Sequence, residues 1–82
     1  MIQLTAEMAK HLPYRKVLAV TGRYNADGTC MRWRVNGAVK LWKTRPNEFR
    51  IPIKYGLNGG YDYITQDNYQ MFHLNGTCEK CG

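Results

Sequence analysis

Short apolar runs alternate with polar positions along most of the chain, and turn residues separate them. This alternation is typical of strands that bury one face. The runs interpreted as strands cover residues 17–21, 31–35, 38–42, 49–54 and 61–65, and they predict a small sheet of three to five antiparallel strands. Pro52 has no N–H to donate, so we expect the run that contains it to lie at a sheet edge.

Two short helices are predicted, one near each end of the chain. Thr5 is placed to cap a helix over residues 6–12, and Pro13 ends it. Near the other end, Tyr69, Phe72 and His73 share a helical face at i, i+3 and i+4 spacing. Together with the sheet, these helices predict an α+β fold. The length of 82 residues is that of a single domain, residues 1–82.

The Asn36-Gly37 pair, which lies between two of the predicted strands, is the clearest turn signal. Asn-Gly between alternating runs favours a two-residue hairpin, because both turn positions need positive φ. We therefore expect a central hairpin at this point of the sheet. Its apolar side chains are expected mainly in the core, and its arginines are expected to lie outward over apolar neighbours. The first group is Met31, Trp33, Val35 and Trp42, and the second is Arg32 and Arg34.

The charge is strongly uneven. The chain has 12 Lys and Arg against 6 Asp and Glu, a net charge of +6, and eleven of the basic residues lie between residues 10 and 54. Such a segment is typical of a surface that meets an acidic partner, either a protein surface or nucleic acid, although a solvated basic face is the alternative. Tryptophans interleaved with basic residues add a stacking surface suited to bases. The candidate partner-binding residues are Arg32, Arg34, Lys40, Lys43, Arg45, Arg50 and Lys54.

The three cysteines favour a metal site over a disulfide framework. Their odd number, with no secretory signal ahead of them, indicates a reducing compartment, the cytoplasm of a host cell. No apolar run approaches the ~18 residues of a membrane span, so no membrane partner is expected. The segment Cys78-Glu79-Lys80-Cys81 has the spacing of a zinc knuckle, in which two thiolates reach one tetrahedral ion.

A second pair of ligands is needed to close such a site. We expect Cys30 and His73 to supply it, with His11 as the substitute fourth ligand; a buried small Cys30 and a frayed tail with free thiols are the alternatives. The predicted cofactor is therefore structural Zn²⁺ held by Cys30, His73, Cys78 and Cys81. Four protein ligands leave no open position for catalysis. Because the chain also has no serine and no phosphate-binding loop, we expect a non-enzymatic protein without a small-molecule substrate.

One resemblance adds a biological setting. The stretch of residues 36–46, NGAVKLWKTRP, followed by residues 49–57, FRIPIKYGL, resembles small uncharacterised proteins of phages and prophages. Small non-enzymatic phage proteins of this kind are similar to anti-CRISPR inhibitors. The resemblance implies inhibition of a host defence system, most concretely an RNA-guided CRISPR nuclease. The basic charge implies docking on an acidic protein patch rather than imitation of DNA. The alternative is a small nucleic-acid-binding regulator that contacts phosphates.

Overall fold

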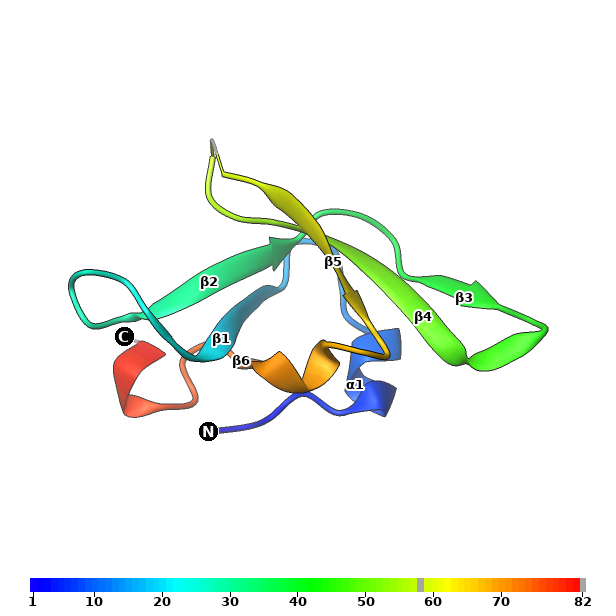
Figure 1. Cartoon of the computed structure of the whole chain (residues 1–82), viewed down its shortest axis with the longest axis horizontal. Coiled ribbons are helices and arrows are strands. Elements are labelled where there is room, and N and C mark those ends of the chain that lie inside the picture. The colour runs from blue at the N-terminus through cyan, green and yellow to red at the C-terminus, as the bar shows by residue number, and fades with distance from the viewer. Residues whose placement is uncertain (58, 82) are drawn as a thin grey trace.

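In the part of the chain that the structure describes, six strands form one antiparallel sheet, and three short helical segments lie around it (Figure 1). The computed structural model describes residues 1–57 and 59–81; Asn58 and Gly82, which the sequence places in a loop and after the knuckle, lie outside the described residues. In chain order the elements are α1 Ala6–Lys10, β1 Val17–Tyr24, β2 Cys30–Val35, β3 Lys40–Trp42, β4 Arg45–Lys54, β5 Tyr61–Thr65, the 3₁₀ turn η1 Tyr69–Met71, β6 Phe72–Leu74 and the 3₁₀ turn η2 Glu79–Cys81.

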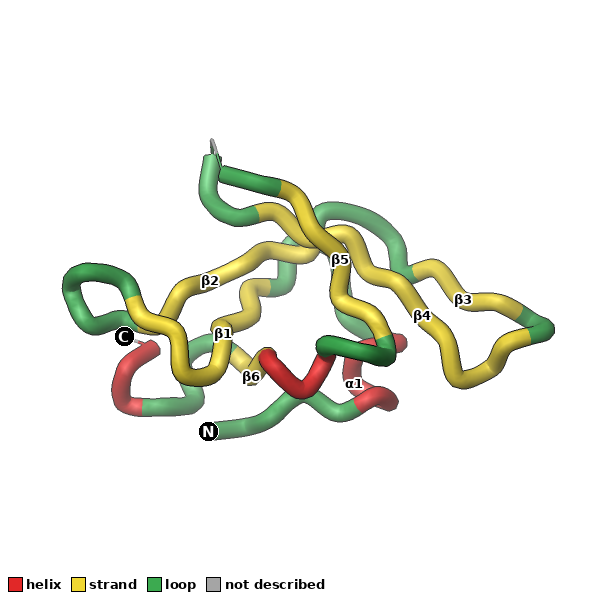
Figure 2. Tube along the Cα trace, in the orientation of Figure 1, coloured by secondary structure: helices red, strands yellow, loops and turns green. Residues whose placement is uncertain are grey.

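The fold is dominated by its sheet rather than clearly α+β, as the strand colour of Figure 2 shows. The N-terminal helix is confirmed, with the Thr5 hydroxyl accepting from Met8 N. The predicted C-terminal helix is wrong beyond one 3₁₀ turn, because Phe72, His73 and Leu74 form β6 and pair with β1. Within residues 1–57 and 59–81, no helix has the length and apolar character to cross a membrane.

The predicted Asn36-Gly37 hairpin is wrong. Strands β2 and β3 pair with β4 instead of each other: Val35 lies opposite Ile53, and Lys40 lies opposite Arg50. Since β5 pairs with residues 50–54 of β4, β2 and β3 occupy successive stretches of its other edge. The tight reversal occurs later, at residues 43–44, where Trp42 lies opposite Arg45.

Pro52 explains this arrangement and overturns its expected place at an edge, because β4 is paired on both sides. Its carbonyl accepts from Asn36 N at 2.8 Å, so its missing N–H faces the same edge, in the interval between β2 and β3. Gly37 passes over the ring here, and a Cβ on Gly37 would lie 2.8 Å from Pro52 Cγ. Gly37 is therefore needed for close approach rather than for positive φ.

The two faces of the sheet are unlike. On the inner face, buried apolar side chains of the strands pack with Leu4, Ala9 of α1 and Tyr69 of η1; the strand residues include Leu18, Val20, Val35, Phe49, Ile51, Ile53, Ile64 and Phe72. Met31 and Trp33 are half-buried against this core, as expected. The outer face carries a second, smaller buried cluster of Ala19, Cys30 and Cys81. The C-terminal tail covers the outer face at the β1–β2 end of the sheet (Figure 1).

We predict that Gly37→Ala destabilises the protein by about 1–3 kcal/mol, because the added methyl meets a rigid proline ring. Urea denaturation of the single variants and of Gly37→Ala/Pro52→Ala measures the coupling between the two positions. Removal of the ring should relieve most of the cost of Gly37→Ala. Equal costs in both backgrounds would contradict the close approach.

Candidate metal centre

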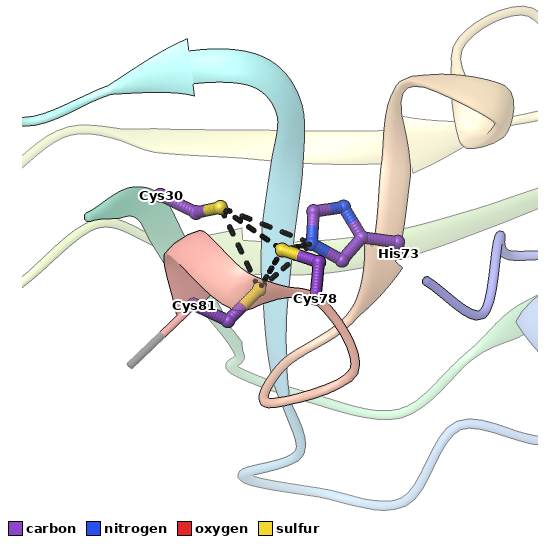
Figure 3. A group of neighbouring side chains, drawn as sticks. All are labelled: Cys30, His73, Cys78 and Cys81. Atoms are coloured by element: carbon purple, nitrogen blue, oxygen red, sulfur yellow. Dashed lines mark hydrogen bonds between the residues drawn. The ribbon is translucent and has the colours of Figure 1, made fainter. Parts of the chain in front are cut away.

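Three thiols and one imidazole converge at the C-terminal end of the molecule (Figure 3). The Sγ atoms of Cys30, Cys78 and Cys81 and the Nε2 atom of His73 all lie within 4.8 Å of one another. Their six separations run from 2.9 Å, for both Cys78–Cys81 and His73–Cys81, to 3.9 Å for Cys30–His73. A zinc ion bound about 2.3 Å from each sulfur has ligands about 3.7 Å apart. The donor set therefore has the shape and nearly the size of a tetrahedral metal site.

Sheet register places two of the donors. His73 lies opposite Ala19 across the β1–β6 pair, and Ala19 lies opposite Arg32 across the β1–β2 pair. Because cross-strand partners share a face, His73 and Arg32 both point to the outer face. Cys30 is two residues from Arg32 and alternates to the same side. The side chains of Cys30 and His73 are almost fully buried there.

Two turns that contain glycine bring the cysteines into position. Gly28 (φ 89°) ends the β1–β2 turn two residues before Cys30, and Gly76 (φ 82°) reverses the chain after β6. The reversal carries Cys78 back over the sheet, and η2 then brings Cys81 around, with Cys81 N donating to Cys78 O at 3.3 Å. The CxxC spacing thus forms one 3₁₀ turn whose two sulfurs face the strand residues.

The other imidazole nitrogen of His73, Nδ1, is held in place by a chain of hydrogen bonds. His73 Nδ1 and Thr21 Oγ1 share a hydrogen bond of 3.0 Å, and the Thr21 hydroxyl donates to Gln3 Oε1 at 3.4 Å. The Gln3 amide in turn donates to Phe72 O at 2.7 Å. With a metal ion bound at the cluster, this chain of partners would keep the proton on Nδ1 and direct the Nε2 lone pair at the ion, the arrangement that second-shell partners impose on metal-binding histidines.

The thiols have opposed proton affinities. Burial is the main cause, and the neighbouring Cys81 and Cys78 sulfurs the next, of a rise in the pKa of Cys30 to about 12. Burial also disfavours the Cys81 thiolate, but hydrogen bonds from Cys78 and His73 outweigh it and lower the pKa of Cys81 to about 6. One thiolate is thus stabilised while another thiol is kept protonated, because burial and repulsion from the neighbouring sulfurs both disfavour a second negative charge. A divalent cation at the centre would remove that repulsion.

The structure brings together all four predicted ligands and leaves out the substitute. His11 caps the end of α1, where its ring contacts Glu7 at 3.2 Å in solvent, so it is not part of the cluster. His73 is the fourth donor, although it lies on a strand rather than at a helix end. Sequence reasoning missed Thr21 and Gln3, because nothing in their spacing links residues so distant along the chain.

Most of the predicted partner-binding residues share the outer face beyond the cluster. Arg34 lies opposite Lys54, and Lys40 lies opposite Arg50. Trp42, expected in the core, instead lies among three cations on this face. Lys43 is in the β3–β4 turn, and Arg45 pairs with Glu48 at 3.0 Å.

Five of the residues that share the outer face, together with two tyrosines of β5, form a surface that we call the basic aromatic face. Its members are Arg34, Lys40, Trp42, Arg50, Lys54, Tyr61 and Tyr63.

Comparison with family models, curated proteins and solved structures found no match to this chain.

We predict that Thr21→Val lowers the affinity for Zn²⁺ by 10- to 100-fold, because it removes the hydrogen-bond acceptor of His73 Nδ1. Competition with a chromophoric chelator measures the affinity. Thr21→Ser keeps the hydroxyl and should bind Zn²⁺ as the parent does. Equal affinities for the valine and serine variants would show that Thr21 does not position the imidazole.

Proposed function

We propose that this chain is a non-enzymatic, zinc-stabilised binding protein. The convergence of three thiols and one buried imidazole on a single point carries the proposal. Thiolate and imidazole are the ligands that zinc prefers in structural sites, and four of them close the tetrahedron. A closed site leaves no position for a substrate or an activated water, so it supports a structural role.

The position of the site explains what a metal ion contributes here. Cys30 belongs to β2, His73 to β6, and Cys78 and Cys81 to the tail. One ion therefore links strands on both sides of β1 to a C-terminal segment whose buried contacts lie mainly in the cluster itself. Binding free energies of structural zinc are about 10–16 kcal/mol and act as folding free energy. That is as large as the whole stability of a typical small domain.

The basic aromatic face supplies the binding surface. Arginine and tyrosine are residue types that anchor interfaces, and this face carries both on a rigid sheet. In the protein-partner form of the proposal, which follows the sequence resemblance, the face docks on an acidic patch of a host-defence protein. An RNA-guided nuclease is its most specific case. A face that takes nucleic acid directly is the second form, favoured by the exposed aromatic rings.

Purified protein is expected to hold one zinc ion per chain by elemental analysis. Chelator, or His73→Ala, should remove the metal and lower the melting temperature by well over 10 °C, because the site's binding energy is folding energy. His11→Ala is the matched control and should change neither quantity. Protein without stoichiometric zinc, or one whose melting is unaffected by chelator, would contradict a structural metal.

The protein-partner form predicts that the zinc-loaded protein inhibits target cleavage by an RNA-guided nuclease. The measurement titrates the protein against preassembled nuclease and guide at fixed target DNA. Reversal of the charge at Arg50 and Lys54, two residues of the basic aromatic face, should weaken inhibition at least tenfold without loss of zinc. Unimpaired inhibition by the charge-reversed variant would place the docking surface elsewhere.

A further inference from the structure

The basic aromatic face carries exposed tyrosine rings on strand β5. Tyr61 is 70% exposed and Tyr63 is 48% exposed, and both project from β5 to the outer side because their partners in β4, Lys54 and Pro52, do so. Large aromatic side chains on an open sheet bring hydrophobic surface into water. Such exposure is explained when the rings stack on a flat ligand.

Each ring of this face carries a cation. Arg50 lies 5.0 Å from the centroid of Tyr63 and 5.7 Å from that of Trp42, and Lys54 lies 5.4 Å from that of Tyr61. These are cation–π distances. The contacts hold charge and ring side by side, so that a planar group on a ring and an anionic group on its neighbouring cation are bound together.

On this face, positively charged side chains lie directly opposite one another on paired strands. Arg34 faces Lys54, and Lys40 faces Arg50, although like charges directly opposite each other destabilise a sheet. The nearby acidic residues do not compensate: Glu48 is paired with Arg45, and Asp62 lies opposite inward-facing Ile53. A sheet that keeps such pairs gains stability when a polyanion neutralises them.

We infer that the basic aromatic face binds single-stranded nucleic acid, with bases stacked on Tyr61 and Tyr63 and phosphates on Arg50, Lys54 and Arg34. The inference rests on the second form of the proposed function, in which this face takes nucleic acid directly, and it specifies that ligand. Sequence-tolerant stacking next to a basic groove is how proteins hold single strands. A duplex keeps its bases stacked inside, and an acidic protein offers few flat groups for two adjacent rings, so the single strand fits this surface best.

The test measures fluorescence anisotropy of labelled dT20 with the zinc-loaded protein, beside a 20-base-pair duplex and polyglutamate as a polyanion without bases. We expect dT20 to bind more tightly than either competitor, with affinity that falls steeply between 50 and 200 mM salt. Tyr61→Ala and Tyr63→Ala should each weaken dT20 binding about 5- to 150-fold. Tyr61→Phe keeps the ring and should bind nearly as the parent does.

A second experiment tests the phosphate contacts with Arg50→Gln, and Lys10→Gln on α1 is its matched control. Arg50→Gln should reduce the salt dependence by about 0.7 in slope, whereas Lys10→Gln should leave it unchanged. Zinc content is measured for every variant, so failure of the metal centre is distinguished from failure of this surface. Equal affinity for dT20, duplex and polyglutamate, tighter binding of polyglutamate, or alanine variants that bind like the parent would overturn the inference.

Discussion

At β1, β2 and β6, the outer side of the sheet is covered by the C-terminal tail, which is anchored through the cluster of Cys30, His73, Cys78 and Cys81. Ala19, Cys30 and Cys81 are buried together there, and the tail contributes mainly its two cysteines to that burial. A chain of 82 residues buries a modest share of its surface, and small domains commonly depend on a metal or disulfide for the remainder. The main core on the inner face accounts for the strands and α1, but it does not account for the tail. The convergence of three sulfurs and an imidazole in one cluster, which could hold a cation, does.

The same centre ties the beginning of the chain to its end. Gln3 bridges His73 in the sheet and reaches it again through Thr21, while Ile2 N donates to Thr77 Oγ1 at 2.9 Å in the turn before Cys78. Leu4 follows directly and lies in the main core. Loss of a metal held at this cluster would therefore act on the N-terminal segment as well as on the tail, because both are positioned by His73 and its neighbours.

Local chemistry made much of this structure predictable. The CxxC spacing and the glycine turns before Cys30 and Cys78 indicated which residues cluster, since turn residues act within a few positions. The failures involve distant partners. Asn36-Gly37 has the residues of a hairpin, but Pro52 leaves an edge of β4 without a donor, and Gly37 is placed against it. Residues 69–73 satisfy helical spacing, yet Phe72 and Leu74 also alternate with His73, and the free edge of β1 selects the strand.

The sheet thus divides its outer face into a closed end and an open end. At the closed end, Cys78 and Cys81 of the tail cover Ala19 and Cys30, which would otherwise meet water. At the open end the continuing strands carry like charges opposite each other and rings exposed to solvent, features that cost stability. Strand β2 reaches from Cys30 at the closed end to Arg34 at the open end, where Arg34 lies opposite Lys54 of β4. Packing at the closed end therefore helps to fix the register of the cations at the open end. Under the proposed function, an anionic ligand with flat groups lying across the open end would offset that cost.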